Sequence, residues 1–390
     1  MQKKEVKKLS SPYTLVVLET TSIQSYLFNS NRLKENVGAS YLVKVATQDW
    51  VYDAIRDIKL IPQSNLDASQ KTDDKDNVIY SYTFSDREIS DREIKEDTLA
   101  VEILYAGGGN TALLFGDKKK AIDFTRALSR KVLRDARGLQ VVFHHADFNW
   151  DTESLAYAVS NAIKALKSAR NDQPARMGIG GLGVTAMCAS TSLPATKLAE
   201  IDDDWQPVSA EVFAKRENAD DANDAFKTLI KEEHRGTYIF PLDFDDMGAP
   251  KGEKNTIAVV HADGNGLGEI IQGLKNKFPS HNDNRDYITF MREFSEGVKQ
   301  LAQDAQKAMV DLLISCIQED KHEKDKNKQR FIKPIHAGNQ SCISLTHKDG
   351  KFCLPFRPLV SGGDDVTFVC EGRIGIALTI KFLEVFEELS

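Results

Sequence analysis

The chain has 390 residues, too many for one ordinary hydrophobic core, and this length predicts two or three domains. Its formal net charge of −7 disfavours a strongly basic nucleic-acid-binding protein, although a local basic groove stays compatible with it. The five cysteines include no Cys-x-x-Cys pair, which argues against a zinc ribbon or disulfide framework and favours a reduced, cytoplasmic protein. No stretch is long enough to span a bilayer, so we expect no membrane partner.

The first part of the chain, residues 1–150, predicts the element order of a ferredoxin-like domain. Residues 13–19 ("YTLVVLE") are typical of a buried strand, and apolar residues at helical spacing predict one amphipathic helix over 38–58. Polar residues 62–99 indicate a solvated insertion. Two apolar runs around Gly-Gly-Gly-Asn then predict a hairpin, which a helix and a last strand follow over 118–148.

A middle region, residues 151–252, is predicted to be mostly helical. It opens with apolar residues at helical spacing and then becomes rich in glycine and in acidic residues. The pattern does not assign an architecture to it beyond a connecting domain.

The order of the first part returns in residues 253–390. "NTIAVVHADGNGLGEII" predicts a strand, a glycine-rich turn and a helix, and a long amphipathic helix follows over 290–317. "LPFRPLVSGGDDVTFVC" predicts a hairpin, and the last segment predicts a helix with one apolar face, formed by Ile376, Ile380, Leu383 and Phe386. A last strand is missing, so we expect the natural protein to continue past Ser390. The predicted fold is therefore α+β, with two ferredoxin-like domains that arose by internal duplication.

Acidic residues gather in the second of these domains. Asp263 follows its first strand, and Asp364 and Asp365 form the tip of its hairpin. Aligning the Val-Val pairs and the Gly-Gly pairs of the two domains places Asp263 on Thr20, and Asp364-Asp365 on Gly109-Asn110. Every acid of the second domain would then have a neutral counterpart, whereas a turn requirement would place acids in both domains.

Metal binding explains such a cluster. Three converging carboxylates raise one another's pKa, and a divalent cation removes this cost. Mg²⁺ or Mn²⁺ would use carboxylate ligands and keep positions for substrate phosphates. We therefore predict that Asp263, Asp364 and Asp365 hold metal and carry catalysis of phosphoryl transfer. Glycine-rich turns let a nucleotide approach the backbone closely, and the predicted nucleotide-binding residues are Gly264, Asn265, Gly266, Gly268, Ser361, Gly362 and Gly363.

Other polar residues are expected to have structural roles. Gly-Gly-Asp-Asp alone is also compatible with an ordinary turn. We expect the histidines beside the strands to serve packing or to lie on the surface, and Cys188 to be buried. For Arg357 a solvent-facing ion pair is the expectation.

Two segments that contain these motifs resemble a known family. "IQSYLFNSNRLKENVGASYLV" (23–43) and "RPLVSGGDDVTFVC" (357–370) are similar to the large polymerase-like subunit of type III CRISPR effector complexes. The resemblance covers roughly residues 13–148 and 255–390. It implies an inactive first palm domain and an active second palm that joins ATP into cyclic oligoadenylate for antiviral defence, with metal on the Gly-Gly-Asp-Asp acids.

The chain departs from the family in two respects, since it has neither the HD nuclease domain nor the paired-cysteine zinc module. These departures favour a stand-alone or reduced relative and leave a cyclic dinucleotide open as the product. Implied partners are ATP and, as alternatives, RNA, CRISPR-type subunits or a second copy of the chain. A non-enzymatic scaffold that binds RNA or partner subunits is the alternative function. A diguanylate-cyclase-like or template-directed polymerase activity is disfavoured, because Gly-Gly-Asp-Asp-Val (362–366) departs from the Gly-Gly-Asp-Glu-Phe signature of diguanylate cyclases.

Overall fold

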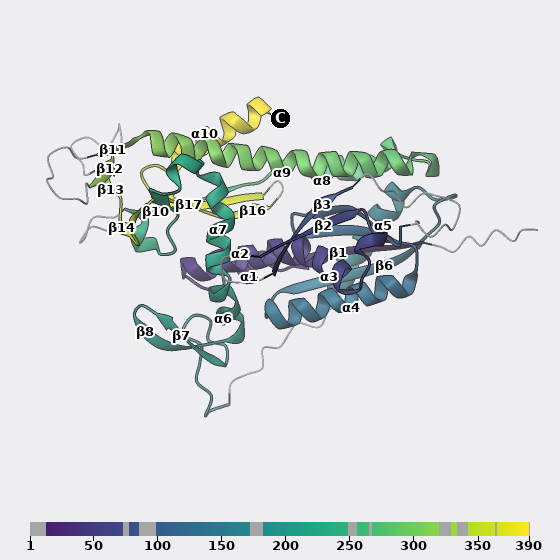
Figure 1. The fold of residues 1–390 in the computed structure, drawn as a ribbon, viewed down its shortest axis with the longest axis horizontal. Helices are drawn as coiled ribbons and strands as arrows, with labels where there is room; N and C mark the ends of the chain where they lie inside the picture. Colours follow the sequence, from purple (N-terminus) through teal and green to yellow (C-terminus); the bar gives the residue numbers. More distant parts are fainter. Residues whose placement is uncertain are drawn as a thin grey trace, which may run out of the picture.

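The computed structural model describes residues 13–72, 78–85, 99–171, 182–248, 256–264, 267–319, 329–333, 342–362 and 365–389. Two larger β-sheets lie side by side, and the helix α9 (Asn284–Ser315) runs along both of them (Figure 1). Within the described ranges, no helix has a stretch long and apolar enough to cross a bilayer.

The first sheet has four antiparallel strands. Their spatial order is β4 (Val101–Gly107), β5 (Asn110–Phe115), β1 (Tyr13–Thr21) and β6 (Gln140–Phe148). The helices that connect these strands are α1 (Ile23–Leu27), α2 (Leu33–Thr47), α3 (Asp49–Asp57) and α4 (Lys118–Asp135). Because the first strand lies between the third and the fourth, this is the ferredoxin-like order that the sequence predicts.

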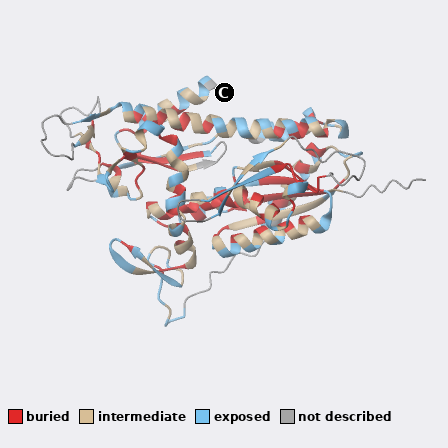
Figure 2. Cartoon of the chain, in the orientation of Figure 1, coloured by how far each residue is buried: buried red, intermediate tan, exposed pale blue. Residues whose placement is uncertain are grey.

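Both faces of the first sheet are buried. Val16 and Leu18 face a core formed with α2, α3 and α4. Leu15 and Val17 point to the opposite face, as strand alternation requires, and there α5 (Leu155–Asn171) and α9 cover them. Figure 2 shows the resulting buried layer within the first sheet.

The single helix predicted over 38–58 is two helices in the structure. The backbone of Gln48 (φ −128°, ψ −80°) leaves the helical region between α2 and α3. Helix α2 also packs closely on α6 (Ala210–Glu217). A Cβ on Gly38 would lie only 1.7 Å from the carbonyl oxygen of Lys215, so this contact requires glycine.

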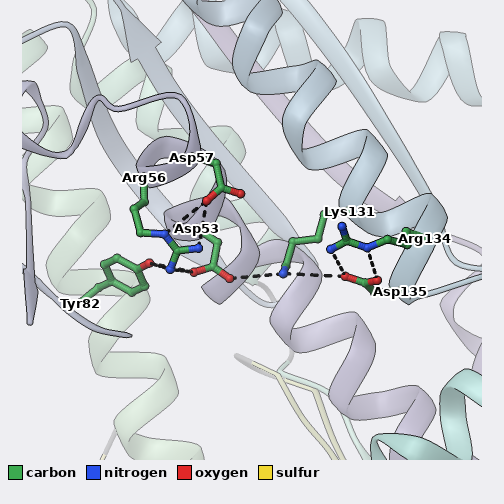
Figure 3. Close-up of polar contacts among 7 residues, drawn as sticks. All are labelled: Asp53, Arg56, Asp57, Tyr82, Lys131, Arg134 and Asp135. Atoms are coloured by element: carbon green, nitrogen blue, oxygen red, sulfur yellow. Dashed lines mark hydrogen bonds and ion pairs between the residues drawn. The ribbon is translucent and has the colours of Figure 1, made fainter. Parts of the chain in front are cut away.

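The predicted insertion contains a hairpin, β2 (Leu66–Thr72) and β3 (Val78–Phe84), after the short 3₁₀-helix η1 (Ile61–Gln63). Figure 3 shows how it is attached to α3: the Tyr82 hydroxyl donates to Asp53 Oδ1 at 2.8 Å and accepts from Arg56 at 2.9 Å. The described hairpin of the insertion is largely exposed, as predicted, and the Tyr82 contacts hold it to α3.

Within its described residues, 151–171 and 182–248, the middle region is less helical than predicted, and its first helix, α5, belongs to the cover of the first sheet. Apart from α5, it has an exposed hairpin and a set of short elements that lead to the second sheet. These elements are β7 (Lys197–Ile201), β8 (Asp204–Val208), α6, α7 (Ala219–Phe226), η2 (Lys227–Leu229), η3 (Glu232–His234), β9 (Tyr238–Ile239) and η4 (Phe244–Met247).

The second sheet has three antiparallel strands in the order β10 (Ile257–Ala262), β17 (Asp365–Glu371) and β16 (Phe356–Gly362). This matches the first three strands of the ferredoxin-like order, and no described strand pairs with the outer edge of β10. The remaining elements of this part are α8 (Leu267–Lys277), η5 (His281–Asp283), β11 (Ile317–Glu319), β12 (Arg330–Ile332), β13 (Ile343–Ser344), β14 (His347–Lys348), β15 (Lys351–Cys353) and α10 (Gly375–Leu389).

Helices α9 and α10 cover one face of the second sheet, where Val366, Phe368 and Cys370 are buried. In α10, Leu378 and Phe382 make this contact, while Ile376, Ile380 and Leu383 are exposed. The predicted apolar face of this helix is therefore largely turned to solvent, and a neighbouring side of the helix packs on the sheet.

The β4–β5 and β16–β17 hairpins have the same register. Gly107 pairs with Asn110 as Gly362 pairs with Asp365, and every other pair follows with the same shift of 255 residues. Both hairpins also carry a β-bulge at the same position, at Leu104 and at Leu359. Bulges bend and twist a strand at a defined place, so the two hairpins share their local shape as well as their pairing.

Candidate active site at the ends of β10 and β17

Asp263 and Asp365 lie beside each other at one end of the second sheet. Ala262 pairs with Val366, and Asp263 is the next residue after β10, while Asp365 is the first residue of β17. Residues directly opposite each other on antiparallel strands point to the same face, with Cβ atoms about 5 Å apart. Both aspartates are exposed. The register thus brings two of the three predicted metal ligands together.

The other predicted site residues divide into two groups. Ser361 and Gly362 pair with Val366 and Asp365, Gly264 follows Asp263, and Gly268 lies in the first turn of α8. The rest lie outside the described residues, namely Asp364, Asn265, Gly266 and Gly363. The described part of the site therefore consists of two strand ends and the base of the hairpin.

The donor set fits a hydrated divalent cation. Among the described residues, no three His, Cys, Asp or Glu side chains are grouped to hold a metal ion. Mg²⁺, however, is commonly bound by one or two carboxylates and completes its octahedron with water and substrate phosphates. Asp263 and Asp365 would provide these two carboxylates, and Asp364 is the neighbouring candidate in the sequence.

The face of the second sheet that carries these acids is open along β10. Val259 on this face is 62% exposed, and His261 is also exposed. The His261 ring nitrogen Nδ1 lies 2.9 Å from Thr367 Oγ1, next to the aspartates along the two strands. The sequence did not indicate this His–Thr contact, because the partners are 106 residues apart.

The strand pairing corrects the alignment of Asp263 with Thr20. Glu19 pairs with Asn110, and Asn110 has the hairpin position that Asp365 has in the second sheet. The counterpart of Asp263 is therefore Glu19, and the prediction that every acid has a neutral counterpart is wrong at this position. The Val-Val alignment was displaced by one residue, and such a slip exchanges the two faces of a strand.

The counterpart face in the first sheet is closed. Glu19 lies 3.8 Å from Arg170, which belongs to the helix α5 that covers this face. The same sheet end thus has an acid in both domains, but only the second sheet exposes it together with an aspartate on the hairpin.

A pocket separates the two hairpin tips. Its lining includes Gly107–Gly109 on one side and Val360 and Asp365 on the other, together with side chains from α2, α7 and α9. The enclosed volume is about 150 Å³. Sites that enclose a whole drug-sized ligand usually have about 300–1,000 Å³, so this pocket would enclose only part of a nucleotide.

Two lysines give this pocket a positive wall. Lys44 of α2 and Lys299 of α9 both line it. Desolvation by the surrounding protein lowers the pKa of Lys44, Asp49 opposes this shift, and the charge of Lys299 adds to it. Lys299 also forms an exposed ion pair with Glu296 at 3.1 Å. Two ammonium groups that repel each other in a pocket are suited to bind a polyanion such as a triphosphate.

Arg357 is not in the solvent-facing ion pair that the sequence suggested. Its side chain is fully buried between β16 and α7, where it donates to the Asn223 side chain and contacts the rings of Phe226 and Phe240. Burial lowers the pKa of Arg357 to about 9. This arginine attaches α7 to the second sheet and does not reach the open face.

Comparisons with known proteins give structural neighbours only. No family model and no curated protein matches the chain. The structure is similar to that of the apo Csm1-Csm4 cassette (9% identity, TM-score 0.47, 100% of this chain and 50% of that chain). It is also similar to the cassette in complex with one ATP (10%, 0.49, 98% and 49%) and to Csm1 from T. onnurineus (10%, 0.43, 97% and 46%). The chain thus spans about half the length of these chains, and at these values the similarity carries no function over to it.

Proposed function

We propose that the second sheet carries a Mg²⁺-dependent nucleotidyltransferase site. It condenses ATP, with release of pyrophosphate, into a cyclic oligoadenylate or a cyclic dinucleotide that serves CRISPR-type antiviral defence. The two sheets are then palm domains of one internal duplication, with the first palm inactive. The shared register and shared bulge of the two hairpins support the duplication.

One observation carries the proposal: Asp263 and Asp365 meet at adjacent strand ends on an open face of the second sheet. Two exposed carboxylates at this spacing repel each other, and a bound divalent cation would remove this repulsion. In the first sheet the same end has Glu19 beside the neutral Asn110, under a covering helix. At this end the two sheets have the same strand register, but they differ in the charge of the paired residues and in their access to solvent.

The remaining residues have complementary roles. Bound Mg²⁺ would lower the pKa of a ribose hydroxyl and neutralise the leaving pyrophosphate. Asp263, Asp364 and Asp365 would hold the metal, and Lys44 and Lys299 would orient the phosphates in the pocket. Gly362 and Gly363 leave space for the nucleotide along the hairpin. The Gly107–Gly109 tip of the first palm forms the opposite wall, so an inactive palm still contributes to substrate binding.

The test is product analysis with matched variants. The protein is incubated with ATP or GTP and Mg²⁺, and products are separated by chromatography and identified by mass spectrometry. Asp263→Asn and the double variant Asp364→Ala/Asp365→Ala should abolish the product formed from ATP. Glu19→Gln changes the corresponding acid of the first sheet and should leave the product level within about twofold, since Glu19 does not line the pocket and faces Arg170 of α5.

Equal product from the double variant would refute the proposal. Binding of ATP without turnover by the unchanged protein would instead favour the scaffold function. Product from GTP but not from ATP would retain the metal site and refute the adenylate product.

A further inference from the structure

The outer face of α4 is strongly basic, in contrast to the acidic chain as a whole. From Asp117 to Arg137 there are eight Lys and Arg residues and three Asp residues, a net charge of +5, whereas the whole chain has −7. The apolar side of α4 is buried against the first sheet through Ala121, Phe124 and Leu128. The positive charge is therefore concentrated on one exposed surface.

The exposed cations of α4 follow a line along the helix. Arg126, Arg130 and Arg134 are each four residues apart and are exposed, and Arg137 continues the line just after the helix ends. Residues at this spacing lie on the same side of a helix, so Arg126 and Arg134 are about 12 Å apart along the axis. A line of cations of this length can contact successive phosphates of one strand.

Several of these charges have no counter-ion. Figure 3 shows that Arg134 forms a bidentate pair with Asp135, at 2.6 and 2.8 Å, and that Lys131 lies between Asp53 and Asp135. Arg126 lies 3.8 Å from Asp123, a weak pair. Across the described ranges, Arg130 and Arg137 form no ion pair. The acids beside α4 thus pair with Lys131 and Arg134 and leave Arg130 and Arg137 available.

The line of cations ends at a cavity of about 560 Å³ between α3, α4 and α6. Arg134 and Arg137 line it, and so do two aromatic residues, Trp50 and Phe213. Lys197 lies at the same cavity, with its ammonium group 3.6 Å from the centre of the Phe213 ring. Asp135 and Glu217 also line the cavity, but Asp135 is already paired with Arg134. The volume is in the range of small-molecule sites, unlike that of the pocket beside Asp365.

We propose that the outer face of α4 and this cavity bind a single-stranded nucleic acid. The arginines of α4 contact its phosphates, and one base enters the cavity beside Trp50 and Phe213. Aromatic side chains accept bases of any sequence by stacking, and a base can enter a cavity only from an unpaired strand. This surface is separate from the aspartates of the second sheet, so the inference does not depend on the proposed function.

The test is a fluorescence anisotropy titration with a fluorescein-labelled oligouridylate about 12 nucleotides long, at several salt concentrations from about 50 to 200 mM. Removing two phosphate contacts by Arg130→Gln/Arg137→Gln should make the negative slope of log K against log salt shallower by about 1.4. The matched control is Lys164→Gln/Lys167→Gln on the exposed side of α5, which removes the same charge and should leave the slope unchanged.

The aromatic contribution has its own variants. Trp50→Leu should weaken binding by roughly 5- to 150-fold, the effect expected for loss of one stacked base, with the salt slope unchanged. Phe213→Leu provides the same measurement on α6 if Trp50→Leu lowers the melting temperature.

Three results would overturn the proposal. The first is no binding of the oligouridylate at the lowest salt concentration. The second is equal loss of affinity in the α5 control, which would indicate a diffuse charge effect. The third is a combination of two observations: both aromatic variants bind the oligouridylate as tightly as the parent, and polyglutamate or duplex RNA displaces it equally well. The surface would then bind an acidic protein or a duplex and not a single strand.

Discussion

Glu102 and Arg357 occupy the same position in the two hairpins, have opposite charges and are both fully buried. Glu102 accepts hydrogen bonds from Arg285 and Arg292 of α9, at 2.8 and 2.6 Å. Arg357 instead has an amide partner, Asn223, and aromatic neighbours, and no carboxylate in the described structure pairs with it. The same position of the hairpin thus contacts a different helix in each sheet. In the first sheet a carboxylate binds two arginines of α9, and in the second a buried guanidinium binds an amide of α7.

We predict that Glu102→Gln lowers the free energy of unfolding by about 3–5 kcal/mol, because it leaves two partly buried guanidinium groups without their shared carboxylate. Urea unfolding followed by circular dichroism measures this change. The control is Glu384→Gln, which removes an exposed i,i+3 pair with Lys381 and should cost less than about 1 kcal/mol. Equal effects of the two variants would show that the contact between α9 and the first sheet does not depend on Glu102.

We predict that Arg357→Met makes the protein more stable at pH 7, by about 1 kcal/mol or more. The folded state lowers the pKa of Arg357 to about 9 from 12.5, so the unfolded chain binds this proton more tightly. The resulting penalty is complete below pH 9 and is relieved as the pH rises from 9 toward 12.5. The stability difference between variant and parent should therefore be larger at pH 7 than at pH 10.

Urea unfolding at both pH values tests this prediction, and Arg130→Met on the exposed face of α4 is the control for the loss of an arginine. A variant less stable than the parent at pH 7 would show that the contacts of Arg357 with Asn223 and Phe226 outweigh the cost of its burial.

We predict that Tyr82→Phe loosens the β2–β3 hairpin without unfolding the first sheet. The variant loses the hydroxyl that bridges Asp53 and Arg56, and hydrogen bonds to charged groups contribute about 1.5–3 kcal/mol. Hydrogen exchange should become faster in β2 and β3 and remain unchanged in β1. Tyr80→Phe is the matched control, because Tyr80 contacts Arg56 through its ring, which phenylalanine retains. Faster exchange in β1 as well would contradict a local role.

The ferredoxin-like order of the first sheet could be predicted because hydrophobic periodicity and turn residues are local signals. The alternation of strand residues did not fix the pairing between strands that are distant in sequence, and for this reason Asp263 was matched with Thr20 and not with Glu19. The break at Gln48 was missed because the apolar residues keep nearly helical spacing across α2 and α3.

The candidate site was predicted from the composition of two turns. The strand register places Asp263 beside Asp365, and their role in holding metal stays a prediction. No pattern in the sequence indicated that α5 covers the corresponding face of the first sheet or that Lys44 and Lys299 line one pocket, because these are contacts between distant segments. The burial of Arg357 was equally hidden, since an arginine next to a proline in an edge strand is usually exposed.

The last prediction concerns stability and metal binding together. Asp263→Asn should raise the melting temperature of the metal-free protein, because it removes the repulsion between two adjacent carboxylates. In the parent protein, Mg²⁺ at one hundred times its Kd should stabilise the folded state by about 2.7 kcal/mol for one site. The variant Asp263→Asn should show less of this stabilisation. Thermal unfolding in EDTA and in saturating MgCl₂ measures both effects.

Glu19→Gln is the control, since Glu19 lies beside the neutral Asn110 and already faces Arg170. It should not raise the melting temperature in EDTA, and its response to Mg²⁺ should equal that of the parent protein. If Asp263→Asn behaved in the same way as Glu19→Gln, the two aspartates would not act as one site. The exposed end of the second sheet would then have no role that distinguishes it from the covered end of the first.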